Sequence, residues 1–150
     1  MSDQKQYCTL KVADLLLGVE VDEIQEILRD TSIMPVPLAH PAIRGLINLR
    51  GQIVTAIDLR HRAGLEQTAE ETPFMTMVLG TAEEPLALVV DSVGDVVDVA
   101  SGVFESPPDT LRGEARRMII GAYKLERELL LVLNLPVVLD LQEQIEEAVE

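Results

Sequence analysis

The chain has 150 residues, 47% of them hydrophobic, and a length that suits one domain or two small modules. Because 26 acidic residues outweigh 12 basic ones and give a net charge of −14, we expect neither a nucleic-acid partner nor insertion into an anionic membrane. The single cysteine excludes an internal disulfide and a thiolate metal cluster.

The first predicted element is a β-hairpin. Apolar runs over residues 7–12 and 15–21 flank Ala13-Asp14, a pair that predicts a tight turn. Cys8 lies inside the first run, where we expect a small buried hydrophobe and not a nucleophile. The residues before the hairpin lack the charged-then-apolar order of a signal peptide, and no apolar run reaches the roughly 18 residues of a membrane helix. We therefore expect a cytoplasmic protein.

Residues 21–30 leave two secondary structures open. Their apolar residues have helical spacing: Val21, Ile24, Ile27 and Leu28. The corresponding segment of the second half of the chain, residues 91–99, is rich in valine and contains Gly94, which disfavours a helix. We therefore predict a helical turn followed by a strand.

The same segment is a candidate contact surface. Ile24, Ile27 and Leu28 are either core residues or part of an exposed apolar patch. A small barrel cannot bury every apolar side chain that it carries, and a patch left exposed usually marks a binding site. Glu26, between Gln25 and Ile27, would add polar specificity to the patch. Both interpretations remain open from the pattern alone.

A second candidate surface is the turn at residues 50–52, between predicted strands 43–49 and 53–57. Gly51 permits a tight backbone and leaves room for a partner to approach. The guanidinium of Arg50 can bind a carboxylate or a carbonyl, or anchor an interface. The alternative is an arginine that is solvated in the turn.

The second half predicts strands over 74–79, 86–90, 118–124 and 129–133 and then a helix over 135–147. Asn134 is the expected N-cap of this helix, and Pro136 suits its first turn. Polar segments at 63–73 and 101–114 are expected to be the boundary between halves and a long loop.

An internal duplication unites these elements. Leu17 and the ten residues after it align with Leu86 and its successors, at an offset of 86 − 17 = 69, and Gly45 aligns with Gly121 at an offset of 121 − 45 = 76. Two matches in the same order predict two homologous halves, 7–66 and 74–141. We expect an all-β fold of two SH3-like β-barrel subdomains with a short C-terminal helix. Whether the first strand is exchanged between barrels is left open.

Catalytic chemistry has little support in the sequence. His40 and His61 have no second ligand at metal-binding spacing. Asp58 and Asp91 each end an apolar run and would form an acid–base pair if they met. The alternative is that each stops a strand and binds a turn amide. The counterpart of Asp58 is Asn134, which cannot ionise and favours that alternative. We expect no enzyme, no metal and no cofactor.

The segment from Gly45 to Arg60 resembles the signature of the CheW family, in which Gly-x-x-Asn-Leu-Arg-Gly precedes an apolar strand and Asp-Leu-Arg. Ile24-Gln25-Glu26-Ile27 and the run from Leu88 to Val93 match in the family's order and spacing, so the resemblance extends from about residue 7 to residue 140. Thr55 departs from the pattern, which usually has proline in that strand.

The resemblance implies a single CheW-like domain over residues 5–145, built from two SH3-like barrels and without enzymatic activity. It implies an adaptor that couples the cytoplasmic tip of chemoreceptors, the methyl-accepting chemotaxis proteins, to the regulatory domain of the histidine kinase CheA, in association with membrane receptor arrays. The resemblance places Glu26, Ile27 and Arg50 at functional surfaces. It also places further residues near a receptor groove between the barrels: Ile24, Asn48, Gly51 and Val93.

Three alternatives accompany this expectation. The chain would fit a coupler of a parallel pathway, such as gliding, twitching or biofilm control. It would also fit a small acidic enzyme that uses Asp58 and Asp91. The amino-terminal half of a response-regulator fusion is disfavoured, because no receiver domain follows.

Overall fold

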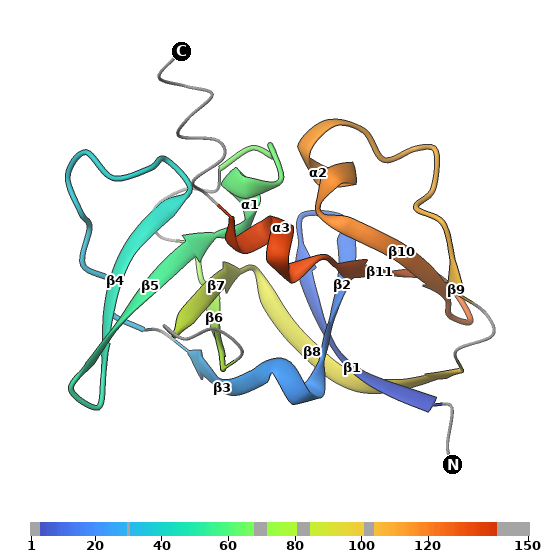
Figure 1. Cartoon of the computed structure of the whole chain (residues 1–150), viewed down its shortest axis with the longest axis horizontal. Helices are drawn as coiled ribbons and strands as arrows, with labels where there is room; N and C mark the ends of the chain where they lie inside the picture. The colour runs from blue at the N-terminus through green and yellow to red at the C-terminus, as the bar shows by residue number, and fades with distance from the viewer. Residues whose placement is uncertain (1–3, 30, 68–71, 81–84, 101–103, 141–150) are drawn as a thin grey trace.

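Two β-sheets lie side by side in the computed structural model, which describes residues 4–29, 31–67, 72–80, 85–100 and 104–140 (Figure 1). The six-stranded sheet has the strand order β8-β1-β2-β11-β10-β9, and the five-stranded sheet has the order β3-β6-β7-β5-β4. The predicted all-β fold with two β subdomains is confirmed.

Short strands with tight connections account for most of the described chain. In chain order they are β1 (Gln4–Val12), β2 (Leu15–Glu20), β3 (Ile24–Arg29), β4 (Ile43–Leu49), β5 (Gln52–Asp58), β6 (Met75–Leu79), β7 (Leu86–Val90), β8 (Ser92–Ala100), β9 (Phe104–Glu105), β10 (Ile119–Lys124) and β11 (Leu129–Leu133). The helical elements are η1 (Val21–Glu23), α1 (Leu59–Arg62), α2 (Gly113–Arg117) and α3 (Leu135–Leu139). The sequence did not predict β9, α1 or α2.

The two halves of the chain exchange their first hairpins. β1 and β2 belong to the sheet that holds β8, β10 and β11, while β6 and β7 belong to the sheet of β3, β4 and β5. β2 pairs in parallel with β11, and β7 pairs in parallel with β5 in the equivalent place. The six-stranded sheet therefore combines a hairpin from the first half with four strands of the second, and the five-stranded sheet combines a hairpin from the second half with three strands of the first. The exchange that the sequence left open thus involves both strands of the hairpin. The bounds 7–66 and 74–141 remain a proposal for the two sequence repeats. Because the hairpins are exchanged, neither repeat coincides with one sheet.

Local backbone structure agrees with the duplication. Residues 21–23 form the 3-10 turn η1 and residues 24–29 form β3, which confirms the predicted turn followed by a strand. The counterpart β8 is a strand throughout, as Gly94 and its valines favour. Ala13 adopts a φ of 55° in the two-residue turn between β1 and β2, so the predicted tight turn is also confirmed.

Three clusters of buried apolar side chains stabilise the arrangement. The largest lies between the sheets and draws on both, with Leu10, Leu17, Ile57, Met77, Leu88 and Leu131 among its members. A second fills the concave face of the five-stranded sheet around Ile47, Val54 and Val89. The third occupies the equivalent place in the six-stranded sheet, around Tyr7, Tyr123 and Leu130. Because the largest cluster lies between the sheets, apolar burial holds them together as one unit.

The C-terminal helix is shorter than predicted. α3 covers Leu135–Leu139, and Asp140 after it has a φ of −86° and a ψ of 87°, outside the helical range. The remainder of the predicted helix, 141–147, lies outside the described residues. Asn134 does act as the N-cap, since its side chain accepts from the Val137 amide at 3.5 Å. No helix within the described ranges has the length and apolar character that a membrane crossing requires.

Candidate protein-binding site

The turn between β4 and β5 presents Arg50 and Gly51 with positive φ angles of 54° and 83°. Two successive positive φ values are typical of a type I′ turn, which matches the twist of a hairpin. The Asn48 side chain supports the turn, because its Oδ1 accepts the Gly51 amide at 3.0 Å. A side chain at Gly51 would meet no atom within 4 Å, so the turn requires glycine there for its conformation and not for space.

Arg50 binds Glu26. Its Nη2 donates to Glu26 Oε1, which makes an ion pair between the β4–β5 turn and β3. These elements lie at opposite edges of the five-stranded sheet, so the pair links the two edges through side chains. The side chain of Arg50 is 70% exposed and that of Glu26 only 21%. Arg50 thus binds a carboxylate of its own chain while most of its side chain stays exposed, and its contact with a partner remains a prediction.

Glu26 retains an unused hydrogen-bond acceptor. Within the described residues its Oε2 is buried and has no hydrogen-bond partner. A carboxylate oxygen in that state carries the cost of lost hydration without compensation. The ion pair therefore has an exposed cation and a sheltered anion with spare accepting capacity.

The other predicted site residues divide into two groups. Ile27 is 40% exposed on β3, and because it follows Glu26 directly in the strand, its side chain points to the opposite face. Ile24 and Val93 are partly buried and pack against the core between the sheets. The two are counterparts in the duplication, and each lies at the start of the strand that follows a crossing from one sheet to the other. The structure thus brings Glu26, Asn48, Arg50 and Gly51 together, leaves Ile27 exposed on the other face of β3, and places Ile24 and Val93 at the sheet junction.

Arginines of α1 and β4 bind the two aspartates that the sequence raised as an acid–base pair. Asp58 is the N-cap of α1, accepts from the Arg60 and His61 amides, and forms an ion pair with Arg44 at 3.2 Å. Asp91 accepts from Arg60 Nε at 2.8 Å and from its Nη2 at 2.6 Å. The hydrogen bonds from Arg60 lower the pKa of Asp91, and the Ala13 amide lowers it further. The interpretation of Asp58 as a residue that stops a strand and binds turn amides is confirmed.

Arg62 is a structural residue that sequence reasoning missed. Its side chain is 2% exposed, and it donates to the Val137 and Val138 carbonyls at 2.6 and 3.1 Å and to Glu114 at 3.2 Å. It therefore ties α1 of the first half to α2 and α3 of the second. Its place directly after Arg60 and His61 carried no signal of burial, because charged residues are rarely buried without a specific partner.

The remaining chemically reactive side chains have structural surroundings. Cys8 is 3% exposed, and burial raises the pKa of its thiol, so the prediction of a buried hydrophobe is confirmed. His40 lies in a loop and accepts the Ala42 amide at Nδ1. Among the described residues no group of three or more His, Cys, Asp or Glu side chains could hold a metal ion.

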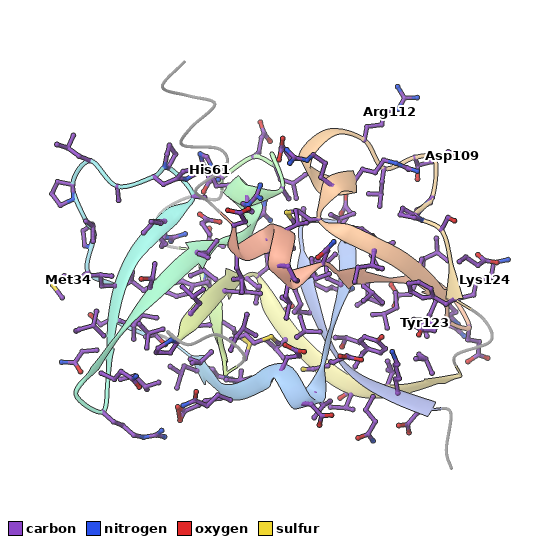
Figure 2. All side chains as sticks on the ribbon, viewed as in Figure 1. Met34, His61, Asp109, Arg112, Tyr123 and Lys124 are labelled. Atoms are coloured by element: carbon purple, nitrogen blue, oxygen red, sulfur yellow. The ribbon has the colours of Figure 1, made fainter. Side chains whose placement is uncertain are left out.

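A cavity of about 700 Å³ lies beside the six-stranded sheet. Its walls come from β1, β2, η1, β9, β10, β11 and α3, with Tyr7, Phe104 and Tyr123 as its aromatic residues. Tyr7 lies 5.5 Å from Tyr123 between ring centroids, and burial raises the pKa of the Tyr7 hydroxyl, helped by the hydrogen bond with Tyr123. Figure 2 shows Tyr123 at the end of the molecule opposite Met34, so the cavity is far from the outer edge of β4. No short sequence motif joins these elements, so the cavity had no signal in the sequence.

The fold and the site together define a class of protein. Two sheets are packed into one unit, an exposed arginine and a sheltered glutamate form an ion pair at the edges of one sheet, and an exposed isoleucine follows the glutamate on β3. Such a mixture of apolar and charged groups is typical of a protein-binding module.

Comparison with known proteins agrees with this class. The family model of the CheW-like domain matches residues 6–143 of this chain. The chemotaxis protein CheW of Treponema pallidum is 25% identical over 89% of this chain and 81% of that protein. The CheW of Bacillus subtilis is 28% identical over 82% of this chain and 79% of that protein. The crystal structure of the scaffolding protein TtCheW from Thermoanaerobacter tengcongensis superposes with a TM-score of 0.80 at 25% identity, covering 91% of this chain and 92% of that one. This chain belongs to the CheW family.

Proposed function

We propose that this protein is a non-catalytic adaptor that couples chemoreceptors to the histidine kinase CheA in bacterial chemotaxis. Membership of the CheW family and the likeness to a scaffolding protein support a scaffold role. The observation that carries the proposal is the Arg50–Glu26 pair, which displays a 70% exposed guanidinium at the tip of a two-residue turn. A charged side chain fixed in an exposed turn is better suited to a partner than to a core.

The chemistry of the pair supports a polar anchor at the centre of a contact. A guanidinium has five donors, and the Glu26 contact engages only one of its nitrogens, so several remain for carboxylates or carbonyls of a partner. Glu26 Oε2 would accept a donor from the partner and so regain a hydrogen bond. Ile27, exposed on the other face of the edge strand β3, would supply apolar contact area to a partner that covers this edge.

An adaptor must contact two partners at once. The receptor tip and the regulatory domain of the kinase are the partners we assign, and their simultaneous binding raises the effective concentration of each near the other. Individual contacts of micromolar strength suffice when an array supplies many of them. Neither aspartate of the alternative enzyme hypothesis is available as a free base, because Arg44 and Arg60 engage them. The proposed place of action is the cytoplasmic side of the membrane, at receptor arrays.

Co-purification with a receptor cytoplasmic fragment and with the kinase tests this function. Wild-type protein is expected to be retained by both, and Arg50→Ala is expected to weaken retention by at least one of them. Arg127→Ala is the matched control, because Arg127 is an exposed arginine in the equivalent turn between β10 and β11. If the Arg50→Ala variant binds both partners as well as the wild-type protein does, Arg50 is not part of the site. Failure of the wild-type protein to bind either partner would overturn the proposed function.

A further inference from the structure

The chain crosses from one sheet to the other twice on the way through its two halves. The first crossing is η1, the three-residue turn from β2 to β3, and the second is Asp91 alone, between β7 and β8. Since β7 belongs to the five-stranded sheet and β8 to the six-stranded sheet, the second change of sheet takes place at one residue, Asp91.

Asp91 is bound from both sheets. Its carboxylate accepts two hydrogen bonds from Arg60 of α1, at 2.8 and 2.6 Å, and α1 directly continues β5 of the five-stranded sheet. The same carboxylate accepts the Ala13 amide at 2.8 Å, and the Asp91 amide donates to the Lys11 carbonyl at 3.0 Å. Ala13 and Lys11 belong to the β1–β2 hairpin of the six-stranded sheet. The crossing is therefore held by a fork of charged hydrogen bonds from Arg60 on one side and by the Ala13 amide and the Lys11 carbonyl on the other.

The first crossing is held differently. The residue that corresponds to Asp91 is Asp22, which is exposed in η1, and the residue that corresponds to Arg60 is Pro136, which has no guanidinium. The Gly80 amide, which donates to the Glu23 carbonyl at 3.0 Å, attaches η1 to the β6–β7 hairpin. The duplication has thus kept the two crossings but placed the arginine–aspartate fork at only one of them.

The fork lies at the sheet junction, next to two of the predicted partner-binding residues. Val93 is two residues after Asp91 on β8, and its counterpart Ile24 begins β3 directly after η1. The separation and angle of β3 and β8 therefore depend on how each crossing is fixed. We propose that Arg60 and Asp91 are positioning residues that fix the angle between the two sheets and so hold β8 at the separation from β3 that a partner requires. The inference rests on the proposed function.

A distance measurement between the sheets tests the inference without any partner. Nitroxide labels at Arg29 of β3 and Lys124 of β10, both exposed, would report the separation of the sheets by pulsed electron spin resonance in a Cys8→Ala background. Asp91→Asn is expected to broaden the distance distribution and to weaken retention by the receptor fragment or kinase about tenfold, a size known for coupling networks. Arg60→Lys should do the same, because an ammonium cannot engage both carboxylate oxygens in a fork.

The controls separate positioning from general destabilisation. Glu105→Gln removes the exposed Lys124–Glu105 ion pair within the six-stranded sheet. For this control the second label is moved from Lys124 to the exposed Glu128, while the first stays at Arg29, so that labelling does not itself remove the ion pair. It should leave the distance distribution and binding unchanged. A distribution for Asp91→Asn and Arg60→Lys that superposes on that of the parent protein would overturn the inference, whatever the change in melting temperature. If Asp91→Asn does not fold, Arg60→Lys supplies the decisive distribution. Failure of the wild-type protein to bind would sink the proposed function alone, because the distance readout does not need a partner.

Discussion

Arg50 and Glu26 form an ion pair between the two edges of the five-stranded sheet, one from the β4–β5 turn and the other from β3. The pair is unequal, because the arginine is mostly exposed and the glutamate mostly sheltered. An ion pair with one exposed partner contributes about 0–1 kcal/mol to folding. We therefore propose that the pair contributes more to partner binding than to stability.

Arg50→Ala is the first prediction. We expect the free energy of unfolding to change by less than about 1 kcal/mol, since the arginine side chain is mostly exposed. Partner affinity should fall by about 2 kcal/mol, the loss typical of an arginine anchor. Urea unfolding and titration calorimetry with receptor fragment and kinase measure the two quantities. A stability loss of several kcal/mol with unchanged affinity would show that Arg50 is a structural residue.

Arg50→Gly distinguishes the effect of the backbone conformation at this position from the effect of the side chain. A φ of 54° is unfavourable for an L-residue other than glycine by about 1–2 kcal/mol. Glycine should therefore give a higher free energy of unfolding than alanine at position 50, by about 1 kcal/mol, while both variants lose the same affinity for partners. Equal stability of the two variants would contradict the left-handed conformation of the turn.

Arg62→Met tests the arginine that joins the helices. The substitution removes hydrogen bonds to two carbonyls and to Glu114, and the loss should be about 2–4 kcal/mol in the free energy of unfolding. Arg117→Met is the matched control, because Arg117 pairs with the same glutamate but is 44% exposed. We expect a change of less than about 0.5 kcal/mol there. Similar losses in the two variants would argue against a special role for burial at Arg62.

The Asp91 carboxylate should make stability depend on acid pH. The Arg60 hydrogen bonds lower its pKa in the folded protein below the ordinary value of 3.8. Its stabilising effect is therefore complete above the unfolded-state pKa of about 3.9 and is lost as the pH falls through the lower folded-state pKa. Wild type should exceed Asp91→Asn in free energy of unfolding near pH 7, and the difference should shrink below about pH 4. A difference that stays constant across this range would contradict the ion pair.

Much of the fold could be predicted because each half repeats the same short pattern. The turn at residues 21–23 followed by β3 was predictable only through its counterpart, since helical spacing of Ile24 and Ile27 alone favoured a helix. The exchange of hairpins had no local signal. β1 has the same apolar pattern whether it pairs within its own half or with β8, and pairing partners are a property of the whole chain.

The candidate site was predictable in part for a similar reason. Asn48, Arg50 and Gly51 are adjacent in sequence, so their motif was visible, and the resemblance added Glu26 and Ile27. The contact of Arg50 with Glu26 depends on the curvature that brings two sheet edges together, which no local pattern encodes. The helix α1 was missed because four residues after Asp58 are too few for a periodic signal.

Kinase output in a reconstituted assembly tests the adaptor role most directly. Autophosphorylation of the kinase would be measured with the receptor alone, with this protein alone, and with both. Positioning the kinase relative to the receptor shifts the population of its active state, so the two together should give far more activation or ligand control than the product of their separate effects. Full receptor control of the kinase in the absence of this protein, or phosphorylation of this protein on a residue that it needs for activity, would contradict the adaptor account.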